Sequence, residues 1–89
     1  MITTKDLNLI KDGYFNIIDA SGFAIYLQSK NTKHYWGIVL DESTTYRNFK
    51  VYHKHNQSDS YHRHKDAPTL MVAIQEIKNH DAFQMSGRK

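Results

Sequence analysis

Four short segments of the chain have the apolar, aromatic and β-branched residues of β-strands, and two of them, residues 23–28 and 47–55, alternate between apolar and polar positions with the period of two that is typical of a strand. The segments are residues 14–19, 23–28, 34–40 and 47–55, and short polar stretches separate them. The positions predicted to face a core are Phe23, Ile25, Leu27, Trp36, Ile38, Leu40, Phe49 and Val51. Because no helical segment intervenes between these strands, the pattern predicts an antiparallel meander.

The period changes to that of a helix towards the end of the chain. Four apolar residues recur at the i, i+3, i+4, i+7 spacing of a buried helical stripe, namely Leu70, Ala73, Ile74 and Ile77. Since Pro68 suits a first helical turn, we expect Asp66 or Ala67 to cap this helix. We expect the helix to end near Asn79.

A shorter helix is predicted over residues 4–12. Its cap would be Thr3 or Thr4, and the Asp-Gly dipeptide at residues 12–13 would end it as a turn. Together the elements predict a single α+β domain over residues 1–89. It would contain an antiparallel sheet of three or four strands, a short N-terminal helix, and a C-terminal helix packed across one face of the sheet.

Composition narrows the classes of function. The 89 residues include no cysteine, which excludes disulfides, thiolate zinc sites and cysteine nucleophiles. A secreted domain of this size usually needs disulfides, so we expect a cytoplasmic protein. The longest apolar run, residues 70–74, is far shorter than the roughly 20 residues that cross a bilayer, so we expect no membrane partner.

The positive charge is concentrated in one segment. The formal net charge is +3, but residues 46–65 alone carry +4, because five cations there are opposed only by Asp59. The cations are Arg47, Lys50, Lys54, Arg63 and Lys65. A localised positive charge favours an anionic partner, although lysines on an exposed strand also improve solubility.

The same segment holds four of the six histidines, which we predict to share one face of a β-hairpin. With a loop at residues 57–60, His55 would lie opposite His62, and His53 would lie opposite His64. The four imidazoles would then be within reach of one zinc, copper or nickel ion. Packing of these histidines at the edge of the core is the alternative.

The opposite face of this hairpin would carry cations and tyrosines: Lys50, Tyr52, Lys54, Tyr61, Arg63 and Lys65. Lys54 would lie opposite Arg63, and an anion would relieve the repulsion between them. Phosphates could bind the cations while bases stack on the tyrosines, and an acidic protein surface would also suit the cations. We therefore expect a non-enzymatic binding module that contacts nucleic acid through this face.

Two other functions stay open. Small size and exposed tyrosines suit a protein-interaction domain that modulates or inhibits a larger enzyme, and the four histidines suit a metal-binding domain. The sequence has no glycine-rich phosphate loop and no nucleophile elbow, so we assign no catalytic residue and no cofactor other than zinc. Trp36 is interpreted as a core anchor. His80 and Asp81 are interpreted as a local hydrogen-bonded pair just past the last helix.

Overall fold

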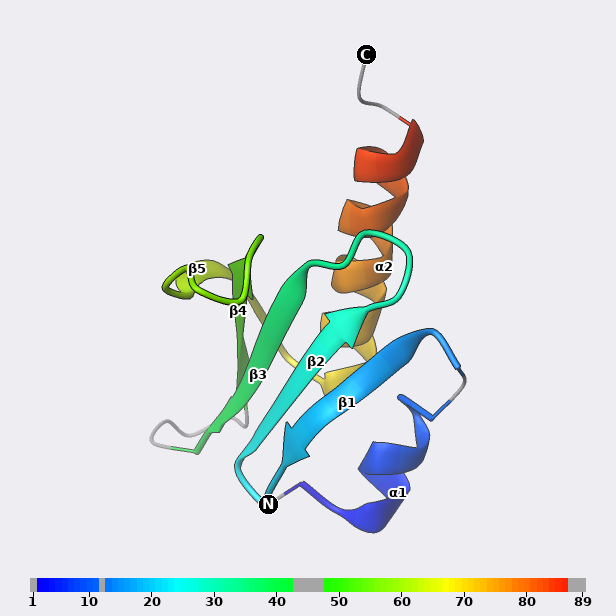
Figure 1. The fold of residues 1–89 in the computed structure, drawn as a ribbon. Helices are drawn as coiled ribbons and strands as arrows, with labels where there is room; N and C mark the ends of the chain where they lie inside the picture. The colour runs from blue at the N-terminus through cyan, green and yellow to red at the C-terminus, as the bar shows by residue number, and fades with distance from the viewer. Residues whose placement is uncertain (1, 12, 43–47, 87–89) are drawn as a thin grey trace.

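A five-stranded antiparallel sheet forms the centre of the computed structural model, which describes residues 2–11, 13–42 and 48–86. The strands are β1 (Phe15–Ala20), β2 (Ala24–Ser29), β3 (Tyr35–Asp41), β4 (Asn48–Lys54) and β5 (His62–Ala67). They lie side by side in chain order (Figure 1). The α+β class and the antiparallel sheet are confirmed.

The expected count of three or four strands is wrong, because β5 completes a fifth. This strand is the second arm of the predicted histidine hairpin, and its sequence, His-Arg-His-Lys-Asp-Ala, has no apolar alternation of its own. Some predicted features lie outside the described residues: Asp12, Arg47 and most of the polar stretch between the third and fourth predicted strands.

The short helix α1 (Thr4–Asn8) precedes β1. Thr3 is its cap, since its hydroxyl accepts the N–H of Asp6 at 3.1 Å while the Asp6 carboxylate accepts the N–H of Thr3 at 2.9 Å. This reciprocal arrangement satisfies two backbone donors that a helix start leaves free. Gly13 then turns the chain towards β1 with a φ of 88°, a left-handed conformation that favours glycine.

The long helix α2 (Leu70–Ser86) covers one face of the sheet and extends past the ends of the strands (Figure 1). Its cap is Thr69, whose hydroxyl accepts a backbone N–H of the first helical turn at 3.1 Å. The predicted caps, Asp66 and Ala67, are instead the last two residues of β5. The predicted end near Asn79 is also wrong, because the helix continues through two further turns. Within the described residues, neither helix is both long and apolar enough to cross a membrane.

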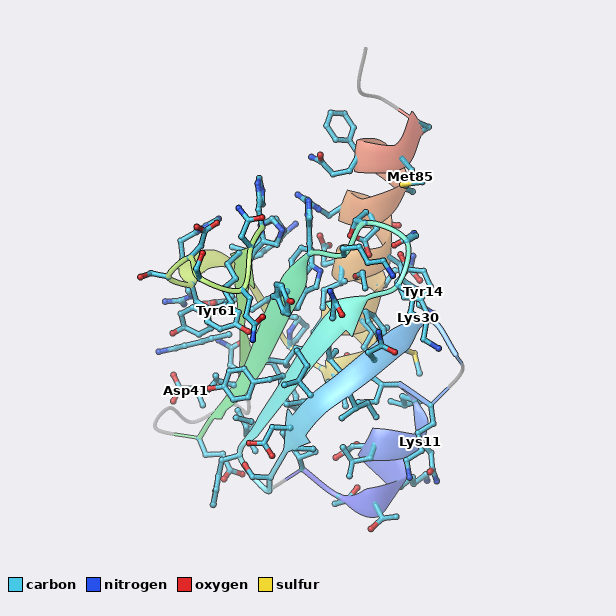
Figure 2. The ribbon with its side chains drawn as sticks, in the orientation of Figure 1. Lys11, Tyr14, Lys30, Asp41, Tyr61 and Met85 are labelled. Atoms are coloured by element: carbon cyan, nitrogen blue, oxygen red, sulfur yellow. The ribbon has the colours of Figure 1, made fainter. Side chains whose placement is uncertain are left out.

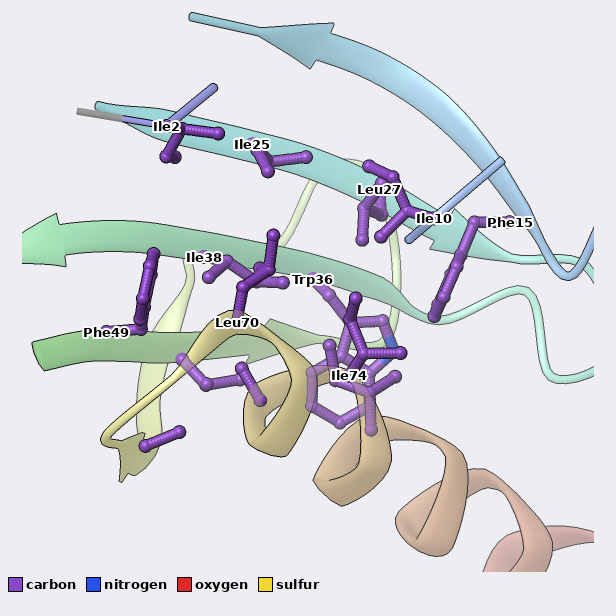
Figure 3. Packing of buried hydrophobic residues seen from close by; sticks show 14 of the residues in the cluster. Ile2, Ile10, Phe15, Ile25, Leu27, Trp36, Ile38, Phe49, Leu70 and Ile74 are labelled. Carbon is purple, nitrogen blue, oxygen red and sulfur yellow. The ribbon is translucent and has the colours of Figure 1, made fainter. Parts of the chain in front are cut away.

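The core lies between α2 and the sheet (Figure 3). The predicted helix stripe is buried, and so are the predicted core positions of the strands with one exception. Phe23 is 55% exposed, because it lies in the turn before β2 rather than in the strand. Ile2 and Ile10, on either side of α1, join the same core. The sheet therefore has one face packed on the helices and one open face.

Candidate metal centre

The β4–β5 hairpin differs from the predicted register. Its turn is closed by Asn56 and Asp59: the N–H of Asp59 donates to the Asn56 carbonyl at 3.1 Å, and the Asp59 carboxylate accepts the N–H and the side-chain amide of Asn56 at 3.2 and 3.1 Å. Such side-chain bonds favour turns at Asn and Asp. The turn consequently lies one residue earlier than predicted. His53 pairs with His62 rather than with His64, and the predicted His55–His62 pair is wrong as well.

A β-bulge in β5 then changes which residues share a face. Arg63 lies opposite Tyr52, and Lys65 lies opposite the buried Val51. His64, between the two, is the extra residue that a bulge inserts into one strand. Lys65 consequently follows Val51 to the helix side of the sheet.

Lys65 is therefore not part of the predicted basic face. Its ammonium nitrogen lies 3.2 Å from a carboxylate oxygen of Glu76 on α2. The predicted cross-strand pair of Lys54 with Arg63 is wrong, so the expected repulsion between these two cations does not arise from direct pairing.

All six histidines of the chain gather beside its single tryptophan, Trp36. They are His34, His53, His55, His62, His64 and His80. His53 is the centre of this histidine cluster, since its ring centroid lies within 6.0 Å of each of the other five. The fully buried ring of Trp36 stacks on the ring of His53, with their centroids 4.2 Å apart.

Three of these rings have nitrogens that converge: each of His34, His53 and His80 offers one ring nitrogen, all within 4.8 Å of one another. His53 Nε2 lies 3.0 Å from His34 Nδ1. The Nδ1 atom of His80 is buried and has no hydrogen-bond partner among the described residues. In a tetrahedral zinc site with bonds of about 2.0–2.1 Å, ligand nitrogens lie about 3.3 Å apart. To reach that geometry, no distance between two of the three nitrogens would have to shorten by more than about 1.5 Å.

The turn between β2 and β3 holds His34 in place. The N–H of His34 donates to the hydroxyl of Thr32 at 3.2 Å, and this hydroxyl donates to the Asp81 carboxylate at 3.1 Å. Lys33, between the two, takes a left-handed φ of 66° that brings the chain into β3. His34 is thereby linked to Asp81, the residue next to His80 on α2.

Asp81 is fully buried and fixes this turn of α2 against the sheet. Its carboxylate accepts the hydroxyls of Tyr14 at 2.7 Å and Ser29 at 2.5 Å, in addition to that of Thr32. The prediction that Asp81 and His80 lie past the helix is wrong, because both belong to α2. Asp81 instead aligns the two elements that carry His34 and His80.

Burial keeps the centre of the cluster unprotonated. Desolvation, together with the neighbouring histidines, lowers the pKa of His53 from 6.5 to about 3. Desolvation also lowers the pKa of His64 and of His80, although Glu76 and Asp81 respectively act in the opposite direction. Neutral imidazole is the form that ligates metals, so the lowered pKa of His53 and of His80 favours the metal-binding form of these two rings.

The cations predicted on the opposite face are partly neutralised. Lys50 lies 3.2 Å from a carboxylate oxygen of Asp41, and Arg63 forms an ion pair with Asp66. Lys54 is the exception, because no carboxylate of the described residues pairs with it. Two of the three described cations on the open face, Lys50 and Arg63, are therefore compensated by carboxylates.

Two members of the converging set, His34 and His80, were not predicted as ligands. Both have a signal in the sequence. His34 lies two residues before Trp36, so it extends the buried face of β3. His80 lies three residues after Ile77, so it extends the helix stripe beyond the predicted helix end.

No protein-family model matches this chain, and comparisons with curated proteins and with solved structures give no significant match.

Proposed function

We propose that this protein binds one divalent transition-metal ion, zinc in the first instance, through His34, His53 and His80. The observation that carries the proposal is the convergence of three imidazole nitrogens within 4.8 Å. They come from three separate parts of the fold: the turn before β3, the strand β4 and the helix α2. The lowered pKa of His53 and of His80 supports it, because neither ring has to lose a proton at neutral pH.

The contact between His34 and His53 also suits a metal site. A hydrogen bond between His34 Nδ1 and His53 Nε2 requires a proton on one of the two nitrogens. Coordination by both nitrogens requires that ring to take its other tautomer, which moves the proton without changing the charge. The 3.0 Å hydrogen bond would thus be exchanged for two metal–nitrogen bonds.

The donor set determines the class of metal. Imidazole nitrogens suit zinc, copper(II) and nickel(II), whereas magnesium and calcium prefer oxygen ligands. The buried carboxylate nearest to the site, Asp81, already accepts three hydroxyl hydrogen bonds. With three protein ligands, the fourth position of a tetrahedral ion would be taken by water.

Isothermal titration of the protein with zinc chloride at neutral pH tests the proposal. We expect saturation at one ion per chain, with a parallel change in the fluorescence of Trp36, which stacks on His53. His34→Gln and His53→Gln should each weaken binding at least about tenfold, because each removes one metal–nitrogen bond.

The matched control is His62→Gln, which removes an exposed imidazole of the same cluster that is not among the three converging residues. We expect this variant to retain the wild-type affinity and stoichiometry. Equal zinc affinity in the wild type and in both ligand variants, with folding verified by circular dichroism, would overturn the proposal.

A further inference from the structure

The open face of the sheet contains a hollow of about 310 Å³ lined by Tyr26, Val39, Tyr52 and Tyr61. It lies on the side away from the histidine cluster, because Tyr26 alternates along β2 with the buried Ile25 and Leu27. Ligand pockets span about 300–1,000 Å³, so a hollow of this size suits a single planar ring.

The floor of the hollow depends on a glycine. Gly37 pairs with Tyr26 on one side and with Tyr52 on the other. A Cβ atom at this position would lie 3.1 Å from Cε1 of Tyr26, so the Tyr26 ring lies close against the Gly37 backbone and would have to shift by a few tenths of an ångström to admit a larger residue. Tyr61, from the segment between β4 and β5 (Figure 2), forms a wall, with its ring centroid 5.9 Å from that of Tyr26 at an angle of 49°.

Among the described cations of the open face, Lys54 is the one that no described carboxylate compensates, and it stands at the rim of this hollow. Lys54 Nζ lies 4.5 Å from the ring centroid of Tyr61 and 5.4 Å from that of Tyr35, and it donates to the carbonyl of Gln57 at 2.9 Å. An anion placed here would meet a charge that no described carboxylate neutralises. Arg63, 6.0 Å from the Tyr52 ring, is a second cation, but it is paired with Asp66.

We propose that this tyrosine hollow binds single-stranded nucleic acid, with one base against Tyr26 and Tyr61 and the adjoining phosphate on Lys54. Every base offers a π-face that stacks on an aromatic ring, and single strands leave that face accessible where duplexes do not. An acidic protein surface would satisfy Lys54 but would leave the aromatic hollow without an occupant. The proposal is independent of metal binding, because the two sites lie on opposite faces of the sheet.

The number of free cations predicts how the binding depends on salt. One or two phosphate contacts imply that the logarithm of the association constant falls with the logarithm of salt concentration with a slope of about −0.7 to −1.4. Fluorescence anisotropy of a labelled short oligothymidylate measures this slope. The titration is done in the presence of a chelator, so that the histidine cluster is metal-free.

Three variants make the experiment specific. Tyr61→Ala should weaken binding about fivefold or more, because one stacking partner is lost. Lys54→Gln should reduce the magnitude of the salt slope by about 0.7. Lys5→Gln, which removes an exposed cation on α1, is the matched control and should change neither quantity.

Two results would overturn this inference. One is an affinity for the oligonucleotide that is the same in the wild type, Tyr61→Ala and Lys54→Gln. The other is binding of an oligoglutamate peptide by a protein that does not bind the oligonucleotide, which would make the partner an acidic protein. Zinc binding would remain intact in either case, so this failure is distinguishable from that of the metal site.

Discussion

Acid is expected to destabilise the metal-free protein through His53. The pKa of His53 is lowered to about 3 in the folded chain, against an ordinary value of 6.5. The unfolded chain therefore binds a proton more readily than the folded chain. The stabilisation is complete above pH 6.5 and is lost as the pH falls through the interval from 6.5 to about 3.

The size of the effect follows from the same shift. Each pH unit below the unfolded pKa costs about 1.4 kcal/mol of unfolding free energy, so lowering the pH to about 5 should cost about 2 kcal/mol from His53 alone. The lowered pKa values of His64 and His80 act in the same direction. Asp66 does not affect this interval of pH. The hydrogen bond from Arg63 lowers the pKa of the Asp66 carboxyl group, so the stabilisation from Asp66 is lost only below the ordinary pKa of 3.8. A loss of this size is a large share of the roughly 5–15 kcal/mol that stabilises a typical domain.

Urea denaturation in the presence of a chelator, followed by the fluorescence of Trp36, measures this free energy at a series of pH values. In His53→Gln the dependence on pH between about 7.5 and 5 should shrink by about 2 kcal/mol relative to the wild type. Wild-type stability that stays constant over this interval would refute the reasoning. An identical pH dependence in the variant would refute the assignment to His53.

Three further substitutions test other parts of the structure. Thr69→Ala removes the cap of α2 and should lower the free energy of unfolding in urea by about 1 kcal/mol, whereas Thr69→Ser should retain most of it. Ile38→Ala leaves a cavity in the fully buried core and should cost about 2–5 kcal/mol in the same assay. Asp81→Leu leaves the buried hydroxyl of Ser29 without its acceptor and should cost about 3 kcal/mol. It should also weaken zinc binding about fivefold or more, and unchanged zinc affinity would show that Asp81 does not position His34 and His80.

The strands that border the core were predictable because one of their faces is buried. In β2, β3 and β4 the apolar positions of the sequence indicate directly which side chains are buried in the core. The edge strand β5 has only one buried side chain, that of Ala67, so its sequence shows no apolar pattern that would predict which residues face the core. The helix end was misplaced for a related reason, since the stripe continues past Ile77 in the polar residues His80 and Asp81.

The register of the histidine hairpin depended on local hydrogen bonds that periodicity does not reveal. The bonds between Asn56 and Asp59 set the turn, and the bulge at His64 then moved Lys65 to the helix side. The grouping of His34 and His80 with His53 depends on packing between distant parts of the chain. No spacing rule links positions 34 and 80, which meet only when α2 lies across the sheet.

The most direct test of the proposed metal centre is the zinc X-ray absorption spectrum of the protein loaded with one ion per chain. We predict a first shell of nitrogen atoms at about 2.0–2.1 Å, with outer-shell scattering from three imidazole rings. In His34→Gln the imidazole scattering should fall to that of two rings. A first shell dominated by oxygen, or one to which a single imidazole contributes, would contradict a centre built from His34, His53 and His80.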